Sequence, residues 1–210
     1  MNINFIFSLF FRIFMYKFKI MQIELNAELF EDAMVYAINK HRGQRRKGSG
    51  LPYVMHPFAV MRRIFANKQS KNMYLLGIAA ICHDIIEDCY DTPEERALGL
   101  LEITKLFGPQ VASIVDELTL DKDKYATIGK KEYLAAELNI MSSYALAIKL
   151  CDRLENVCDM IDMDSKFQKY YVAQTRYIIS KLDRHLSPTH KNLIAQIEDE
   201  CSKYELMLSA

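Results

Sequence analysis

An apolar run in the first half of the chain ends in two polar residues, and it constrains the fold more than any other feature. The run Leu75–Cys82 contains no charged side chain and is followed directly by His83 and Asp84. A segment this apolar is expected in the core, so the imidazole and the carboxylate enter the core with it. Such groups are costly to desolvate unless something compensates them, and a bound divalent metal ion is the usual compensation. The pair therefore predicts a metal site whose other ligands come from elsewhere in the chain.

Length and composition place the chain among helical globular proteins. It has 210 residues, of which 50% are hydrophobic, and it contains 7 Gly and 5 Pro. This length is enough for one domain with a proper core. Lys plus Arg and Asp plus Glu number 27 each, so the formal net charge is zero. Because no overall field attracts nucleic acid or a membrane surface, we expect neither as a partner, and any basic site must be local.

Hydrophobic residues recur at helical spacing along most of the chain. No period-2 alternation is sustained, so we predict an all-α fold, a single helical bundle of about eight to ten helices. A capping box at Thr92–Glu95 marks one helix start. Helices are predicted at 29–41, from Pro57, at 72–88, from Pro93 to Gly108, and at 111–118, 130–139, 144–160, 166–185 and 188–208. The segment 121–129 is predicted to be a polar loop.

The first 20 residues are rich in Phe and Ile, but three basic residues interrupt them. Their uncharged part is shorter than the roughly 20 residues that a membrane-spanning helix needs, and no small-residue cleavage site follows. We expect residues 1–20 to be a disordered extension or a misannotated start, with Met21 as the true start and the domain at 21–210. An interfacial membrane anchor is the alternative.

The five cysteines argue against a disulfide framework. Their number is odd, and no two of them are spaced as C-x-x-C. Neither a disulfide-stabilised secreted fold nor a zinc knuckle is therefore expected. We interpret them as reduced and mostly buried thiols of a cytoplasmic protein.

Two more acids follow the His-Asp pair one helical turn further along. Glu87 lies four residues after His83, and Asp88 lies four residues after Asp84. On one helix these spacings place each acid on about the same face as its partner. One helix end is thus expected to present His, Asp, Glu and Asp together.

Two further segments offer metal ligands. Asp152 lies in an apolar helical segment, and His56 stands at the mouth of a helix. Together with His83 and Asp84 they form a set of two imidazoles and two carboxylates, which suits Mn, Fe or Zn rather than a thiolate site. Each has a simpler explanation, because His56 alone could cap a turn and Asp152 alone could pair with a neighbouring basic side chain. Their joint occurrence favours one shared site.

Five motifs follow one another along the chain: Gly43–Lys47, Pro52–Pro57, His83–Asp88, Phe107-Gly108 with Val111, and Lys149–Asn156. In this order they resemble the hydrolase domain of the RelA/SpoT proteins and the stand-alone small alarmone hydrolases, which are HD-domain metal phosphohydrolases. The resemblance extends from about Ala33 to Met160. It implies a metal-dependent (p)ppGpp 3′-pyrophosphohydrolase that releases pyrophosphate and GDP or GTP, with one Mn²⁺ ion.

The resemblance assigns metal ligands and catalytic acids by position. Glu87 and Asp88 match the acidic pair that orients and deprotonates the attacking water. An acid one turn away from a metal ligand can accept the proton of that water. Four residues match the metal ligands of the family: His56, His83, Asp84 and Asp152.

The resemblance also assigns the substrate contacts. Arg46 and Lys47 match the basic pair that contacts the nucleotide, and Asn156 matches an Asn that helps to hold it. Arg45 and Lys149 are further candidates. Positive charge is needed where phosphoryl oxygens gather negative charge, whereas a planar guanidinium could instead stack on a purine. The simpler alternative is a solvated basic turn, and the spacing does not fit a P-loop.

Other functions remain open. An HD-family phosphohydrolase acting on another nucleotide, of the nucleotidase or NADPH phosphatase type, would use the same metal chemistry with a different base pocket. A second alternative is a catalytically inactive nucleotide-binding module, against which the intact Glu87–Asp88 pair argues. A membrane-tethered regulator would depend on the Phe-rich start. We expect a cytoplasmic enzyme with hydrolase activity alone, and the sequence leaves its oligomeric state open, with a homodimer as one option.

Overall fold

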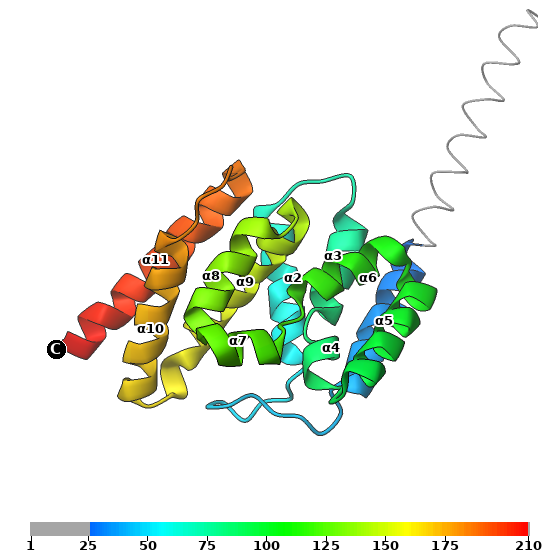
Figure 1. Cartoon of the computed structure of the whole chain (residues 1–210), viewed down its shortest axis with the longest axis horizontal. Coiled ribbons are helices and arrows are strands. Elements are labelled where there is room, and N and C mark those ends of the chain that lie inside the picture. Colours follow the sequence, from blue (N-terminus) through cyan, green and yellow to red (C-terminus); the bar gives the residue numbers. More distant parts are fainter. Residues whose placement is uncertain (1–25, 210) are drawn as a thin grey trace, which may run out of the picture.

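A computed structural model describes residues 26–209 and shows an all-α fold (Figure 1). Residues 26–40 form the first helix of this part. The other elements are α2 (Met55–Asn67), α3 (Met73–Cys82), α4 (Ile85–Asp88), α5 (Pro93–Phe107), α6 (Pro109–Leu118), α7 (Lys122–Ile128), α8 (Lys130–Ile140), α9 (Ser143–Cys158), the 3₁₀ helix η1 (Asp159–Asp162), α10 (Ser165–Ser180) and α11 (Pro188–Ser209). The predicted fold class is confirmed. The prediction for residues 1–20 lies outside the described residues.

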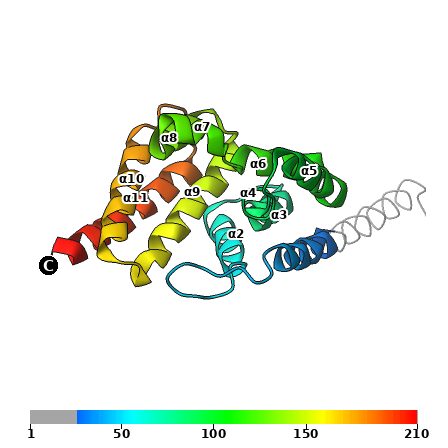
Figure 2. The same ribbon diagram turned by 60° about the horizontal axis from the view of Figure 1, so that its bottom comes forward.

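Helix α9 runs through the centre of the bundle and packs against α2, α6, α10 and α11. Figures 1 and 2 show it enclosed between α2 on one side and α10 and α11 on the other. Every residue from Ala145 to Asp152 is buried, because neighbouring helices cover all sides of this segment. Lys149 and Asp152 are therefore buried together with the aliphatic side chains around them.

Helix α3 is also enclosed over most of its length, and it contains the apolar run. All residues from Leu76 to Cys82 are buried, and the helix packs against α2 and α6. Gly77 allows the close approach of two aromatic rings, since a Cβ atom there would lie 2.7 Å from atoms of Phe30 and Phe65. A helix that is apolar all round is stable only when it is enclosed in this way.

The prediction of one continuous helix at 72–88 is wrong at its polar end. Helix α3 ends at Cys82 and α4 begins at Ile85, so His83 and Asp84 lie at a break. The imidazole of His83 bonds through Nδ1 to the carbonyl oxygen of Ala80 at 2.7 Å. In a continuous helix that carbonyl would accept the N–H of Asp84. The helical spacing nevertheless survives, because the N–H of Asp88 donates to the carbonyl of Asp84 at 2.9 Å.

The predicted polar loop at 121–129 is also wrong, because most of it forms α7. Its start is capped by Asp121, whose Oδ1 accepts the N–H of Lys124 at 3.1 Å. The segment has no sustained apolar stripe, so hydrophobic periodicity does not reveal it. Capping and contact with α8 replace the stripe as the source of its stability.

Helix α10 ends five residues before the predicted boundary at 185. The side chain of Asn139 explains the early end. Its amide donates to the carbonyl of Lys181 at 2.8 Å and accepts the N–H of Asp183 at 2.7 Å. These bonds draw the chain out of the helical path, and the sequence gives no local sign of them.

None of the helices in residues 26–209 is both long enough and apolar enough to span a bilayer.

We predict that Thr92→Ala lowers the free energy of unfolding by about 1 kcal/mol. The hydroxyl of Thr92 accepts the N–H of Glu95 at 3.2 Å, and Glu95 accepts the N–H of Thr92 at 3.0 Å. Both residues are exposed, so the alanine change removes the cap without disturbing the core. Urea denaturation measures the effect, and Thr92→Ser is the control that keeps the hydroxyl. Equal stability of the alanine variant and the wild type would contradict a stabilising cap.

Candidate active site

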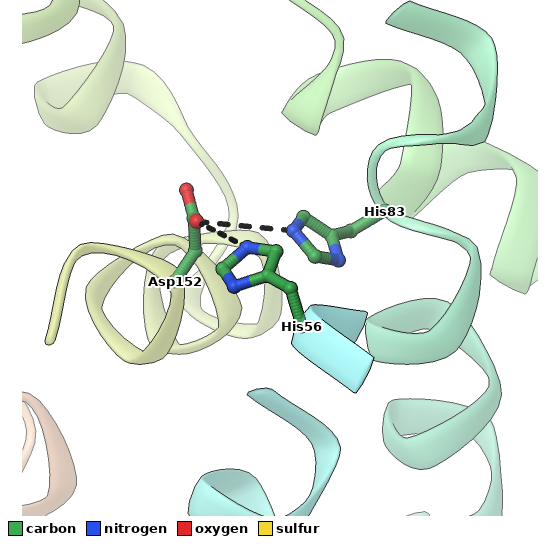
Figure 3. A group of neighbouring side chains, drawn as sticks. All are labelled: His56, His83 and Asp152. Carbon is green, nitrogen blue, oxygen red and sulfur yellow. Dashed lines mark hydrogen bonds and ion pairs between the residues drawn. The ribbon is translucent and has the colours of Figure 1, made fainter. Parts of the chain in front are cut away.

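Three elements that are far apart in the sequence bring four polar side chains together. His56 comes from the first turn of α2, His83 and Asp84 come from the break between α3 and α4, and Asp152 comes from α9. Figure 3 shows a ring nitrogen of each histidine facing the carboxylate of Asp152. His56, His83 and Asp152 each offer a ligand atom, and these atoms lie within 4.8 Å of one another. We call the four residues the His/Asp cluster.

Each imidazole of the His/Asp cluster lies close to two carboxylate oxygens. His56 Nε2 is 3.1 Å from Asp152 Oδ1 and 3.7 Å from Asp84 Oδ2. His83 Nε2 is 3.1 Å from Asp84 Oδ2 and 3.9 Å from Asp152 Oδ1. Both histidine side chains are at most 2% exposed. The structure therefore brings all four predicted ligands to one buried point.

The hydrogen bonding of His83 fits a metal ligand. Its Nδ1 donates to the carbonyl oxygen of Ala80, which leaves the lone pair of the neutral ring on Nε2. Within residues 26–209 this buried Nε2 has no hydrogen-bond partner. A lone pair that faces two carboxylates is repelled unless a cation lies between them. A backbone bond on the other ring nitrogen is typical of metal-binding histidines, so the cluster suits a divalent cation that accepts nitrogen and oxygen ligands.

Without a cation, the His/Asp cluster holds a proton instead. Burial lowers the pKa of His83, but the charges of Asp84 and Asp152 outweigh it and raise that pKa to about 10. Burial raises the pKa of Asp152, whereas Lys149 and the two imidazoles lower it to well below its usual range. A proton and a divalent cation thus compete for the same negative charge.

Lys149 lies beside the His/Asp cluster and is buried with it. Its Nζ is 3.2 Å from Asp152 Oδ2. Burial lowers the pKa of Lys149, but the charges of Asp152 and Asp84 raise it overall, so the ammonium stays charged. The simpler explanation of Asp152, a pair with a neighbouring lysine, is therefore present in the structure. It involves only Oδ2, because Oδ1 faces the two imidazoles.

Tyr53 contacts the His/Asp cluster although it is not among the predicted site residues. Its hydroxyl donates to Asp84 Oδ2 at 2.7 Å, and its ring lies 5.9 Å from that of His56 and 4.9 Å from that of His41. The bond fixes the carboxylate that approaches both imidazoles. Its position three residues before His56 is the one signal in the sequence that could have pointed to it.

Glu87 and Asp88 lie beside the His/Asp cluster, as their spacing predicts. Glu87 Oε2 accepts the N–H of Leu120 at 3.4 Å. Burial raises the pKa of Glu87, and Asp84 and Asp88 add to this rise. Burial and the charge of Asp84 also raise the pKa of Asp88. A carboxylate with a raised pKa is a better base near neutral pH.

A cavity of about 460 Å³ opens at the His/Asp cluster. This volume lies in the range of small-molecule sites. All predicted site residues line it except His83, which lies behind the wall. The sequence does not predict the part of the wall that α10 forms, because α10 has the pattern of an ordinary amphipathic helix. Four residues of α10 and one neighbouring residue of α9 form this part: Phe167, Tyr170, Tyr171 and Gln174, with Arg153.

The basic loop at 41–54 reaches from the first helix to the end of α9 (Figures 1 and 2). Arg46 Nη2 is 2.8 Å from Asp159 Oδ2 and donates to Asn156 Oδ1 at 2.9 Å. Asn156 Nδ2 in turn donates to Asp152 Oδ1 at 2.6 Å. A chain of hydrogen bonds therefore connects the loop to the His/Asp cluster. Lys47 is exposed at the cavity.

Arg45 and Glu155 differ in their relation to the cavity. Arg45 is exposed, lines the cavity and donates through Nη1 to the carbonyl of Gly50 at 2.9 Å. Glu155 pairs with Arg63 of α2 and does not line the cavity. This pair stabilises the contact of α2 with α9.

The sequence also matches a known domain family. Residues 33–186, which include every residue of the site, match the HD domain. The chain belongs to the HD-domain family. The name of this family refers to the His-Asp pair, here His83 and Asp84.

Relatives within the HD-domain family include ppGpp hydrolases. Guanosine-3′,5′-bis(diphosphate) 3′-pyrophosphohydrolase MESH1 of Homo sapiens is 31% identical over 179 residues, which cover 81% of this chain and 94% of the relative. The protein of the same name from Mus musculus is 35% identical over 135 residues, covering 64% and 70%. GTP pyrophosphokinase rsh of Brucella melitensis is 34% identical over 140 residues, but these cover only 17% of that longer protein.

A solved structure supports the fold and the homology. It is that of a metazoan ortholog of SpoT that hydrolyses ppGpp, and it superposes with a TM-score of 0.67 at 26% identity. The match covers 83% of this chain and 94% of the other. The likeness therefore extends over nearly the whole of that enzyme.

We predict that Tyr53→Phe lowers the affinity of the metal-stripped protein for Mn²⁺ about tenfold. The change removes the hydroxyl that fixes Asp84 Oδ2 and leaves the ring in place. Titration calorimetry measures the affinity. Tyr36→Phe is the matched control, because that hydroxyl donates to Glu102 and does not line the cavity. Unchanged affinity in Tyr53→Phe would show that Asp84 needs no such support.

Proposed function

We propose that this HD-domain protein hydrolyses ppGpp and pppGpp at the 3′ position and releases pyrophosphate with GDP or GTP. One observation carries the proposal. A buried cluster of two imidazoles and two carboxylates opens onto a cavity that also contains an acidic pair and several cationic side chains. The names of the two mammalian relatives and of the structural relative support the same activity.

We propose that His56, His83, Asp84 and Asp152 hold one divalent cation. Mn²⁺ is our choice among the metals that accept this nitrogen and oxygen set, because the resemblance to the RelA/SpoT hydrolase domain implies it. A bound cation of this kind lowers the pKa of a coordinated water and polarises a phosphoryl oxygen. Tyr53 keeps Asp84 in place, and the bond of His83 to Ala80 keeps its Nε2 directed into the cluster.

We assign the proton transfer to Glu87 and Asp88. In the reaction, water attacks the phosphorus that is joined to the 3′ oxygen, and the bond between this phosphorus and the 3′ oxygen breaks. The proton of the attacking water passes to one of the two carboxylates, and the 3′ oxygen of the product takes up a proton. The raised pKa values of both carboxyls make them suitable bases at neutral pH.

We assign the basic loop to the nucleotide. Arg46 is fixed by Asp159 and Asn156, so its planar guanidinium suits a base stacked on its face. Lys47 and Arg45 are exposed at the cavity and form no ion pair among the described residues, so they suit phosphate oxygens. Lys149 is a weaker contact, because Asp152 already holds its ammonium.

We infer that the enzyme acts in the cytoplasm on a free nucleotide and has no nucleic-acid partner. The zero net charge supports the absence of nucleic acid, and five free cysteines suit a reducing compartment. We propose that the hydrolase domain comprises residues 21–210 and does not include residues 1–20.

We predict that the metal-stripped protein releases no pyrophosphate from ppGpp and that added Mn²⁺ restores the release. The His/Asp cluster alone supplies no Lewis acid and no activated water. Chromatography of the products measures the reaction, with NADPH and guanosine mononucleotides as alternative substrates. Orthophosphate from one of these, without pyrophosphate from ppGpp, would replace the proposed substrate by another nucleotide.

We predict that Glu87→Gln and Asp88→Asn each lower kcat for ppGpp by about 10² to 10⁴, the usual contribution of a positioned base. Affinity for Mn²⁺ should change little, because neither carboxylate belongs to the His/Asp cluster. Glu94→Gln is the matched control, since Glu94 is exposed on α5 and lies outside the cavity. Full activity in both variants would remove these acids from the mechanism.

A further inference from the structure

Arg153 forms part of the cavity wall on the side of α10, and the proposed reaction gives it no role. Its guanidinium carbon lies 4.8 Å from the ring centroid of Tyr171, and its Nη1 donates to Gln174 Oε1 at 3.3 Å. Arg153 directly follows Asp152 in α9. Successive side chains of a helix diverge by about 100°, so the two residues line neighbouring but different parts of the cavity.

The partners of Arg153 are themselves fixed. Gln174 is only 5% exposed, and its Nε2 donates to the hydroxyl of Tyr170 at 3.0 Å. The amide oxygen of Gln174 is thereby left for Arg153. The ring of Tyr171 stacks on that of Phe167, with centroids 5.6 Å apart and an angle of 18° between the planes. The guanidinium is therefore held in one place before any ligand arrives.

The charge of Arg153 is not compensated in the way that the neighbouring charges are. Arg46 pairs with Asp159, and Lys149 pairs with Asp152. Across residues 26–209, no carboxylate lies within ion-pair distance of Arg153. A half-buried guanidinium with unused donors and no carboxylate partner is a site for an anion, because its planar fork matches two phosphate oxygens.

In ppGpp, the substrate has two diphosphate groups, and only one of them can lie at the His/Asp cluster. We propose that Arg153, supported by Gln174 and Tyr171, binds the 5′-diphosphate of the nucleotide. The proposal depends on the proposed function, since that function places the 3′-diphosphate at the cluster. On this proposal, the wall that contains Arg153 distinguishes nucleotides with a 5′-diphosphate from those without one.

The test compares substrates that share the 3′-diphosphate and differ at the 5′ end: ppGpp, the 5′-monophosphate analogue, and guanosine 3′-diphosphate. We expect Arg153→Met in the Mn²⁺-loaded enzyme to raise KM for ppGpp about tenfold while kcat changes less than twofold. KM for guanosine 3′-diphosphate should not change. Arg153→Lys keeps the charge but not the fork, so its KM for ppGpp should rise about threefold.

Arg62→Met is the matched control, because Arg62 is exposed on α2 and does not line the cavity. An equal rise of KM for all three substrates, a loss confined to kcat, or no change would overturn the proposal. If Arg153→Met does not fold, Arg153→Lys alone decides between these outcomes.

A binding measurement separates this proposal from the proposed function. Titration calorimetry with GDP and with guanosine requires no turnover. We expect Arg153→Met to weaken GDP binding about tenfold and to leave guanosine binding unchanged. Equal GDP affinity in both proteins would overturn the 5′-diphosphate subsite even if ppGpp is hydrolysed. Arg153-dependent GDP binding without pyrophosphate release from ppGpp would instead overturn the hydrolase activity alone.

Discussion

The buried juxtaposition of two imidazoles and two carboxylates is the interaction on which the rest of the structure depends. Asp152 lies in a helix that neighbours enclose on all sides, and His83 follows another such helix. Burial leaves both groups little contact with water, so each relies on the other, on Lys149 and on a cation. The apolar enclosure of α3 and α9 is therefore a condition of the chemistry, because it makes every charge in the His/Asp cluster effective over a short distance.

The fold class and the set of candidate ligands could be predicted because both leave local signs. Apolar residues at helical spacing mark the helices, and a histidine or an aspartate inside such a stretch is conspicuous. The break at His83 could not be predicted, since it depends on a bond from the imidazole to Ala80 that forms only once the side chain is enclosed. Helix α7 leaves no such sign for a different reason, because capping by Asp121 and packing on α8 replace an apolar stripe.

The residues that would contact the substrate leave weaker signs in the sequence than the metal ligands do, because their properties depend on partners that are distant in sequence. Arg46 is one of several basic residues in a loop until the fold brings Asp159 beside it, which neutralises its charge and fixes its plane. Arg153 reads as an ordinary helical arginine until α10 supplies Tyr171 and Gln174 without supplying a carboxylate. Two arginines of the same cavity thus acquire different capacities, one for a flat base and one for an anion, and only tertiary contacts separate them.

This division also separates the His/Asp cluster from the part of the cavity that faces the rest of a ligand. The His/Asp cluster is built from α2, the α3–α4 break and α9, and its four side chains are buried and tolerate little change. The cavity wall is completed by the loop at 41–54 and by one face of α10, whose side chains are partly exposed except for that of Gln174. Asp152 and Arg153 stand at the boundary between the two regions on a single helix. Because α9 fixes their relative position, a phosphate bound at Arg153 orients the nucleotide relative to the His/Asp cluster, and recognition at one end of the cavity determines which bond lies at the other.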